Sequence, residues 1–212
     1  MLAFVKGLAM CSEPSGVFDD GFLIAIRALV NVHHSIYPQI PPQGIYFEAL
    51  VAQAFRQIRK PFTTVTPSRA NLSGHDLLVE NHRLSLKTET GRNTKADTIH
   101  VTKLCTTEKD PWTAETLVQR TVDHLSRYDL ILMLRAVWEL PLIRYQLIEI
   151  PIVLLNKLAS ATYAAVGNRR GRQSIGADVC DGDDVLFHVH FDGSDGKCQI
   201  RKHTGYRVVL EI

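Results

Sequence analysis

This sequence has few cysteines and almost no net charge, and each of these two features excludes a class of protein. The four cysteines, at positions 11, 105, 180 and 198, form no Cys-x-x-Cys pair. A chain of 212 residues can bury a core without cross-links, so a disulfide scaffold is not expected. The 24 Lys and Arg residues against 22 Asp and Glu residues give a net charge of +2, which excludes a histone-like polybasic protein.

Long apolar runs and nucleotide-binding motifs are also missing. No run approaches the roughly 20 residues that cross a bilayer, and the apolar start Met1–Met10 is interrupted by Lys6 and lacks the basic region of a signal peptide. No G-x-x-x-x-G-K-[ST] motif is present, which argues against a motor-driven enzyme. The composition, 45% hydrophobic and 22% charged, is that of a globular protein. We expect one cytoplasmic domain without a membrane partner.

Hydrophobic periodicity predicts an α/β protein. Apolar residues at helical spacing predict four helices, over Gly21–His34, Ile45–Lys60, Thr113–Tyr128 and Ile152–Ala165. Alternating or short apolar runs predict the strands Phe62–Pro67, Asp76–Glu80, Arg83–Thr90, Thr98–Leu104, Asp129–Val137, Tyr145–Ile150, Val185–Phe191, Cys198–Lys202 and Tyr206–Ile212. The turn residues Asp192–Gly196 predict a hairpin near the C-terminus.

Three polar residues stand out in the middle of the chain. Glu48 lies in a predicted helix, Asp76 opens a predicted strand, and Lys87 lies on the polar side of the next strand. Strand periodicity of two puts residues 85, 87 and 89 on one face, so Lys87 can join Asp76 if the two strands pair. This ordered set, within about Ile45–Val137, resembles the PD-(D/E)xK nuclease superfamily and, within it, the type II restriction endonucleases.

The resemblance implies a fold and a division of the single domain 1–212. The fold is restriction-endonuclease-like, a mixed five-stranded central sheet flanked by helices. Residues 1–44 would form an N-terminal helical segment and residues 45–137 the nuclease core. Residues 138–212 would complete the sheet and add a C-terminal β-rich extension that recognises DNA.

The resemblance also implies an activity. It is Mg²⁺-dependent cleavage of double-stranded DNA at a short specific site, by a homodimer whose two-fold symmetry matches that of the site. Asp76, Glu48 and the backbone carbonyl of Leu86 would hold the metal, because Mg²⁺ prefers oxygen ligands. Lys87 would orient or deprotonate the attacking water and hold the phosphate.

The sequence departs from the family's motif at two positions. His75 replaces the usual Pro, and Ser85 stands where the second acid usually stands, which gives Ser85-Leu86-Lys87 in the catalytic strand. A Ser-x-Lys form occurs in the superfamily, where an acid from elsewhere completes the site. The candidates, in order of preference, are Glu48, then Glu89 as a further metal ligand, then Glu115, whose place at a helix N-terminus the helix dipole explains without function.

Basic and amide side chains outside this motif are candidate DNA contacts. In the loop after the Lys87 strand, Arg92 and Lys95 are suited to phosphates. A Gly-flanked cluster of Arg169, Arg170 and Arg172 is suited to the DNA backbone or minor groove, although a surface connection explains it equally well.

The C-terminal hairpin is the predicted base reader. Its second strand carries the candidate contacts Gln199, Arg201, Lys202 and His203. Gln199 and Arg201 share one face, and both side chains can make bidentate contacts with base edges in a major groove that admits a two-stranded ribbon. An ordinary exposed strand is the alternative.

Three other functions remain open at this point. The first is a repair or recombination nuclease of the same fold. The second is a non-catalytic DNA-binding protein, which Ser85 would explain. The third is a metal-binding β-barrel enzyme built on His188 and His190, which share one face of a strand.

Overall fold

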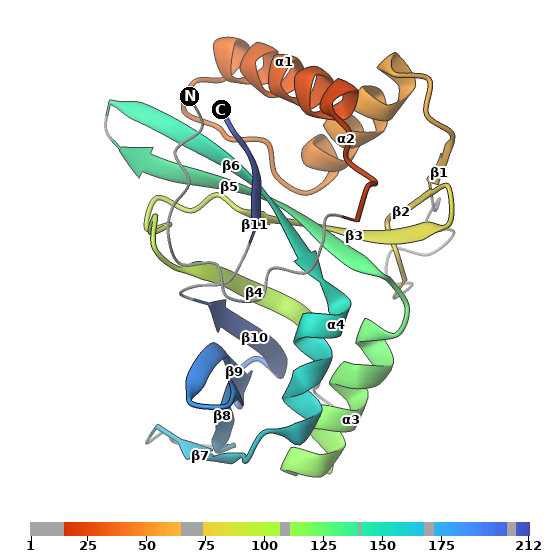
Figure 1. The fold of residues 1–212 in the computed structure, drawn as a ribbon. Coiled ribbons are helices and arrows are strands. Elements are labelled where there is room, and N and C mark those ends of the chain that lie inside the picture. Colours follow the sequence, from red (N-terminus) through yellow and green to blue (C-terminus); the bar gives the residue numbers. More distant parts are fainter. Residues whose placement is uncertain (1–14, 65–73, 107–110, 140, 168–171, 203–206) are drawn as a thin grey trace.

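The computed structural model describes residues 15–64, 74–106, 111–139, 141–167, 172–202 and 207–212. Two β-sheets, with helices against them, form the molecule (Figure 1). Several predicted features lie outside the described residues: the apolar start Met1–Met10, Cys11, Arg169, Arg170, His203, and the ends of the predicted strands Phe62–Pro67 and Tyr206–Ile212. Within the described part of the chain, no helix is both long and apolar enough to span a membrane.

The larger sheet has six strands and carries Lys87. In spatial order they are β1 (Phe62–Thr64), β2 (Leu77–Val79), β3 (His82–Glu89), β5 (Leu130–Glu139), β6 (Leu142–Pro151) and β11 (Arg207–Glu211). The β3–β5 pair is parallel and the other pairs are antiparallel, so the sheet is mixed. Strand β5 is buried on both faces, which explains its continuous apolar run.

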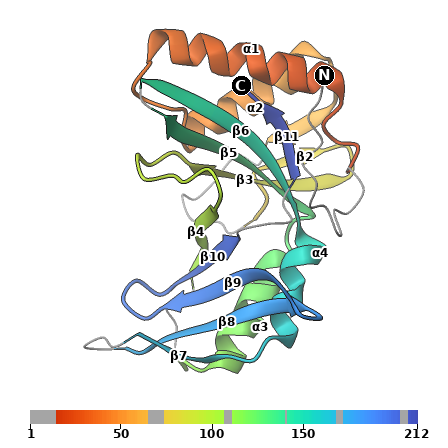
Figure 2. The same ribbon diagram turned by 60° about the vertical axis from the view of Figure 1, so that its left-hand side comes forward.

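The second sheet is antiparallel throughout and lies below the first (Figure 2). Its strands, in spatial order, are β4 (Ile99–Thr106), β10 (Lys197–Lys202), β9 (Asp184–Asp192), β8 (Ser174–Asp181) and β7 (Ala164–Val166). Strand β4 follows β3 in the chain but pairs with β10, so the chain leaves the first sheet through the loop between residues 90 and 98.

Two hydrophobic cores hold these layers together. Helices α1 (Asp20–Ile36) and α2 (Ile45–Gln57) pack on one face of the larger sheet, against even-numbered β5 residues such as Leu132 and Leu134. The other face, with Ile131 and Met133, packs against α3 (Ala114–Leu125), α4 (Ile152–Leu155), η1 (Asn156–Ser160) and the second sheet. The alternation of β5 therefore serves both cores.

The structure confirms the α/β class and the mixed sheet flanked by helices, with three corrections. The central sheet has six strands rather than five, and β4 belongs to the second sheet, because alternation predicts a strand but not its partner. The helix predicted over Ile152–Ala165 is too long: the helical segment, α4 followed by the 3-10 helix η1, ends at Ser160, and β7 follows, in a segment with the poor helix formers Ser160 and Thr162. Strand β8 was not predicted, because Gly176 interrupts its pattern.

Candidate active site

Asp76 is tied directly to the strand that carries Lys87. Its backbone N–H donates to the carbonyl oxygen of Leu84 at 2.8 Å, which extends the β2–β3 pairing by one residue. Its carboxylate oxygen Oδ2 accepts a 2.6 Å hydrogen bond from the Leu86 backbone N–H and a 3.4 Å bond from Ser85 Oγ. The predicted pairing of the two strands is therefore confirmed, and it places the Asp76 carboxylate beside the Ser85-Leu86-Lys87 segment.

The edge of β3 beyond Asp76 is open. Strand β2 pairs with β3 only from His82 to Leu84, so residues 86–89 have β5 alone as a neighbouring strand in the sheet. Backbone groups along a strand point to alternate edges, and Leu84 and Leu86 both bond toward Asp76. The Leu86 carbonyl therefore points to this open edge, as a metal ligand at that position requires.

A pocket of about 330 Å³ occupies this edge between the two sheets. Gly44 and Phe47 line it from the start of α2, Lys87 from β3, and Lys103 from β4. Strand β4, which pairs in the second sheet, lines the other side of the pocket. Two lysines thus line one pocket, a charge suited to an anionic ligand such as a phosphate.

Glu48 lies close enough to Asp76 and Lys87 to interact with both electrostatically. Partial burial raises the pKa of Glu48, the negative charge of Asp76 raises it further, and Lys87 lowers it. The structure therefore brings together the three residues that the sequence singles out from a helix and two strands. Two carboxylates that repel each other are stabilised when a cation binds between them.

The donors at this position fit a hard divalent cation. Among the described residues, no group of three or more His, Cys, Asp or Glu side chains could hold a metal ion. The available set is smaller and made of oxygen: the carboxylates of Asp76 and Glu48 and the Leu86 carbonyl. Both hydrogen bonds to Asp76 use Oδ2, and in the described part of the chain Oδ1 accepts none. Such a set, completed by water, is typical of Mg²⁺ sites.

Ser85 has a different role from the acid that usually stands at its position in the family motif. Its side chain is buried, and its hydroxyl donates to Asp76 rather than facing the pocket as a ligand. The Ser85 hydroxyl therefore helps to orient the Asp76 carboxylate.

The other two candidate acids have other partners in the structure. The Glu89 carboxylate forms a 2.6 Å ion pair with Arg135, whose side chain is fully buried. Glu115 is exposed at the start of α3, where its own backbone N–H and the Thr113 hydroxyl lower its pKa. Glu89 is thus engaged by a cation of the protein. Glu48 is the candidate acid that interacts electrostatically with both Asp76 and Lys87.

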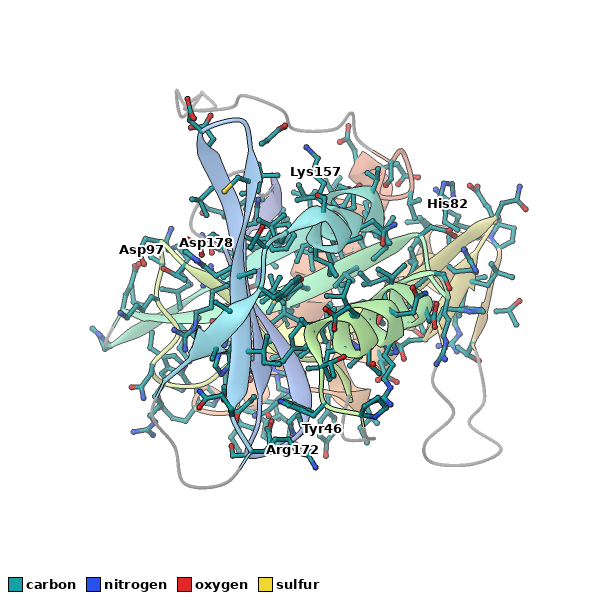
Figure 3. All side chains as sticks on the ribbon, turned by 90° about the horizontal axis from the view of Figure 1, so that it is seen from below. Tyr46, His82, Asp97, Lys157, Arg172 and Asp178 are labelled. Carbon is teal, nitrogen blue, oxygen red and sulfur yellow. The ribbon has the colours of Figure 1, made fainter. Side chains whose placement is uncertain are left out.

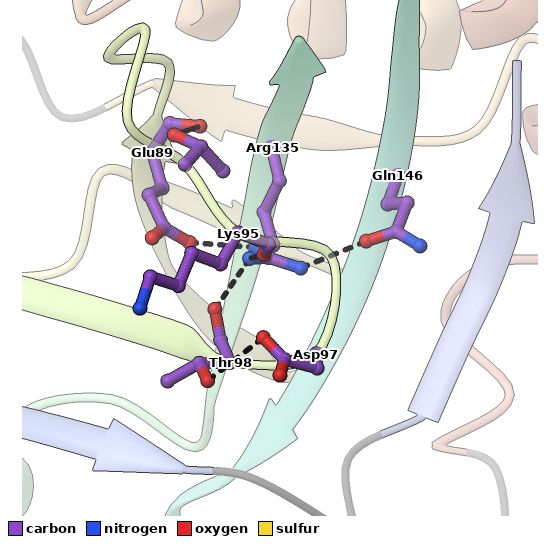
Figure 4. Close-up of polar contacts among 7 residues, drawn as sticks. Glu89, Lys95, Asp97, Thr98, Arg135 and Gln146 are labelled. Atoms are coloured by element: carbon purple, nitrogen blue, oxygen red, sulfur yellow. Dashed lines mark hydrogen bonds and ion pairs between the residues drawn. The ribbon is translucent and has the colours of Figure 1, made fainter. Parts of the chain in front are cut away.

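Arg135 and His124 are two residues of this region that the sequence reasoning missed. Arg135 contacts Glu89, Gln146 and the loop between β3 and β4 (Figure 4), and the only signal was one arginine inside an apolar run. His124 lies on α3. Burial lowers its pKa to about 4, with the nearby charges of Lys87 and Arg127 contributing, so the imidazole is neutral at pH 7.

The predicted base-reading strand is only partly accessible. Gln199 and Arg201 lie on the open face of the second sheet and line a groove of about 1050 Å³. Strand β10 lies between β4 and β9, so the hairpin is not the free two-stranded ribbon that the sequence predicted, because β4 covers its edge. The Gln199 amide is within hydrogen-bond distance of His100, at 3.3 Å, and of Asp192, at 3.4 Å.

The structure contradicts the predicted DNA contact of Lys202. Its side chain is 2% exposed and shares the inner face of β10 with Cys198 and Ile200. Its ammonium group donates a 2.9 Å hydrogen bond to the Leu186 carbonyl, so it is directed into the sheet. Strand alternation explains the error: Lys202 has the opposite parity to Gln199 and Arg201.

Three of the predicted phosphate contacts are exposed. Arg92 and Lys95 lie in the loop between β3 and β4, and the Arg92 guanidinium lies 5.4 Å from the centre of the Trp138 ring. Arg172 stacks in the same way on Trp112, at 4.7 Å, at the bottom edge of the view in Figure 3. The guanidinium groups of the two arginines are thus held against aromatic rings at the surface.

The histidine pair of β9 does not form a metal site in the described structure. His188 Nδ1 is hydrogen-bonded to Asp178 of β8, and both His188 and His190 line the groove with Arg201. No third ligand joins them within the described ranges. The strands around them form an open sheet, with β4 and β7 at its edges, rather than a barrel.

Comparisons with known proteins point to one family. The model of the family described as "SmaI: Type II site-specific deoxyribonuclease" matches residues 6–209. The type II restriction enzyme SmaI of Serratia marcescens is 31% identical over 190 residues, which cover 87% of this chain and 75% of that protein. No solved structure matches. The family match includes Glu48, Asp76 and Lys87 and every strand except the end of β11.

Proposed function

Because this chain belongs to the SmaI family of type II site-specific deoxyribonucleases and is a restriction endonuclease, we propose that Asp76, Glu48 and Lys87 form its active site. The observation that carries the proposal is the 2.6 Å hydrogen bond from the Leu86 N–H to Asp76 Oδ2. It joins the acid to the strand of Lys87 at an open sheet edge, beside a pocket lined by two lysines. Glu48 reaches the same two residues electrostatically.

We further propose that the metal is Mg²⁺, held by Asp76, Glu48 and the Leu86 carbonyl. When bound, the ion would neutralise the charge that develops on the phosphate and lower the pKa of a bound water. Ser85 keeps the Asp76 carboxylate turned toward β3 through its hydrogen bond. Glu48 supplies the second negative charge that the family motif normally takes from the position of Ser85.

Lys87 acts on the water and the phosphate in this proposal. Its side chain is half-buried and lines the pocket, where an ammonium group can donate to a phosphate oxygen and orient the attacking water. His124 cannot take over as a cation at pH 7, because its pKa is lowered to about 4. Lys103, on the opposite wall, adds attraction for the DNA backbone.

The substrate in this proposal is double-stranded DNA bound by a homodimer. A two-fold symmetric protein presents one active site to each strand of a symmetric duplex site. Arg92, Lys95 and Arg172 would contact phosphates, and Gln199 and Arg201 base edges. Arg169, Arg170 and His203 remain predicted contacts from the sequence. The Glu89 carboxylate, paired with Arg135, is left out of the metal site.

The test is cleavage of a long DNA of mixed sequence with Mg²⁺ and, separately, with EDTA. We expect discrete bands with Mg²⁺ and intact DNA with EDTA. A smear would contradict cleavage at one short site, and bands in EDTA would contradict the metal proposal. Sedimentation of the protein alone and with a short cognate duplex tests the homodimer; one protein chain per duplex at saturation would count against it.

A further inference from the structure

We propose that the loop between β3 and β4, residues 90–98, is a preformed base-reading element, with Asn93 as its base contact and Arg135 as the residue that positions it. The inference rests on the proposed active site, because it uses the place of the loop relative to Lys87. It adds a specificity element that belongs to neither the metal site nor the C-terminal hairpin.

The loop begins and ends beside the candidate active site. Thr90 follows Lys87 by three residues, which is about 10 Å along a strand. The loop then leads into β4, whose Lys103 lines the pocket. Bases along one DNA strand are spaced at about 3.4 Å. A phosphate at Lys87 would therefore place bases about three steps away next to this loop, within the length of a short recognition site.

Arg135 holds the loop from the inside of the protein. Its guanidinium is fully buried and bonds to four partners on three elements (Figure 4). Nε donates to Glu89 at 2.6 Å and Nη1 to Gln146 of β6 at 2.8 Å. Nη2 donates to the backbone carbonyls of Lys95, at 2.5 Å, and Thr98, at 2.6 Å. One side chain thus joins the end of β3, strand β6 and the second half of the loop.

A second set of contacts holds the first half of the loop. Trp138, three residues after Arg135 on β5, donates from Nε1 to the Thr90 carbonyl at 3.2 Å. The Thr94 backbone N–H donates to the Gly91 carbonyl at 3.0 Å and closes a turn over residues 91–94. Arg92 stacks over the Trp138 ring. Because Arg135 and Trp138 bond only to backbone carbonyls of the loop, they fix its path and leave its outward side chains available.

Asn93 is one of those available side chains. Asn93 and Lys95 are exposed, and among the described residues neither side chain has a hydrogen-bond or ion-pair partner. An amide presents a donor and an acceptor side by side, which can match the edge of a base. The amide of Gln199, by contrast, already contacts His100 and Asp192. A loop that is ordered before binding loses little entropy when such a side chain meets DNA.

The chemistry of Arg135 explains why this residue type is needed. Its planar fork serves four acceptors at once, whereas lysine is a single point charge with three donors. Burying a charge in an apolar strand is costly unless all its donors are bonded. The substitution Arg135→Lys therefore keeps the charge beside Glu89 but cannot hold Gln146 and both loop carbonyls together.

The test compares Asn93→Ala and Arg135→Lys with Arg83→Lys as a matched control. Arg83 of β3 makes a similar fork, to Asp129, which directly precedes β5, and to the Ser126 carbonyl, but at the other end of β3. Each variant is assayed for kcat and KM on the cognate duplex and on its single-base variants. Hydrogen exchange of residues 90–98 and thermal unfolding are measured alongside.

We expect Asn93→Ala to lose discrimination at one base pair by about 5- to 150-fold, the range for one base contact. Arg135→Lys should relax the same base pair, raise KM more than it lowers kcat, and increase exchange in residues 90–98. Arg83→Lys should lower the unfolding temperature alone. If Arg135→Lys does not fold, Asn93→Ala still decides whether the loop reads a base.

Two results would overturn the inference. One is wild-type discrimination in Asn93→Ala, and the other is a loss in that variant that is equal on every sequence, which would make the loop a backbone contact. Either result leaves the proposed active site standing as long as Asp76→Asn is inactive. Cleavage by Asp76→Asn at the wild-type rate would remove the active-site proposal itself, whatever the loop variants do.

Discussion

The Leu86 backbone amide donates to Asp76 Oδ2 at 2.6 Å, and this one bond sets the position of the acid relative to Lys87. Side chains along β3 alternate, so Ser85 and Lys87 lie on the opposite face from Leu86, which packs in the core between the larger sheet and helices α1 and α2. A charge-assisted bond to the backbone does not depend on the identity of residue 86, so the geometry survives changes of side chain there.

Asp76→Asn should abolish cleavage and leave the fold and DNA binding intact. The amide oxygen of asparagine can still accept from the Leu86 N–H, so the contact that joins Asp76 to β3 remains. The negative charge that would hold the cation is lost, and with it a charge that repels phosphate, so binding should be unchanged or tighter. Cleavage kinetics and a binding titration check this. Wild-type cleavage by the variant would show that the central residue is wrongly assigned.

Lys87→Ala should slow cleavage by about two to four orders of magnitude, the contribution typical of a positioned acid or base. The fold should tolerate the change, because Lys87 is half-buried at a pocket wall and contributes little to either core. Lys157→Ala is the control, since Lys157 pairs with Asp181 beside the second sheet, away from the pocket. Single-turnover rates and circular dichroism are the measurements. An unfolded Lys87→Ala with a folded control would support a structural role instead.

Glu48→Gln should stabilise the metal-free protein at pH 7 while reducing cleavage. Burial and Asp76 raise the pKa of Glu48, so between its unfolded and folded pKa values the folded chain binds more protons. Stability therefore falls as pH rises through that window, and the glutamine removes this penalty. Thermal unfolding is measured from pH 3 to pH 8. The unfolding temperature of the variant should exceed that of the wild type at pH 7, and this difference should disappear at the acidic end. Mg²⁺ should stabilise the wild type more than the variant.

Glu115→Gln is the matched control for Glu48. Contacts at the start of α3 lower the pKa of Glu115, so its charge contributes stability above its unfolded pKa and the glutamine should remove it. The two substitutions therefore have opposite signs at pH 7. Of the two variants, only Glu115→Gln should cleave DNA at the wild-type rate. A loss of cleavage in Glu115→Gln, with normal cleavage by Glu48→Gln, would show that Glu115 rather than Glu48 completes the site.

Much of the candidate site was predictable because its order follows local patterns. Helical spacing located Glu48, and strand parity placed Lys87 where pairing of β2 with β3 brings it to Asp76. The predicted boundaries of α1, β3 and β5 lie within a few residues of those in the structure. These features depend on residues that are close in sequence or belong to one hairpin, so a local sequence pattern predicts them.

What the sequence could not predict depends on distant partners. Alternation marked β4 and β10 as strands, but not that β4 pairs with β10 and covers the edge of the hairpin. The partners of Arg135 come from residues 89, 95, 98 and 146, which no local pattern connects. Lys202 was misjudged by residue type, because a lysine can bury its stem and bond to a carbonyl within a sheet.

The last prediction separates base contacts from backbone contacts on the second sheet. Arg201 is exposed on the groove face of β10, opposite His100 of β4 and His188 of β9, so its guanidinium is available to a base edge. Arg201→Ala should cost about 1–3 kcal/mol at one base pair and relax the preference there.

Arg172→Ala should instead weaken binding to every sequence alike and lower the salt slope by about one, as the loss of one phosphate contact does. The measurement is binding of both variants to the cognate duplex and its single-base variants at two salt concentrations. If Arg201→Ala also weakens all sites equally, the groove face only positions the duplex. The loop between β3 and β4, held by Arg135, would then be the main reader, and Asn93→Ala should account for a correspondingly larger share of the discrimination.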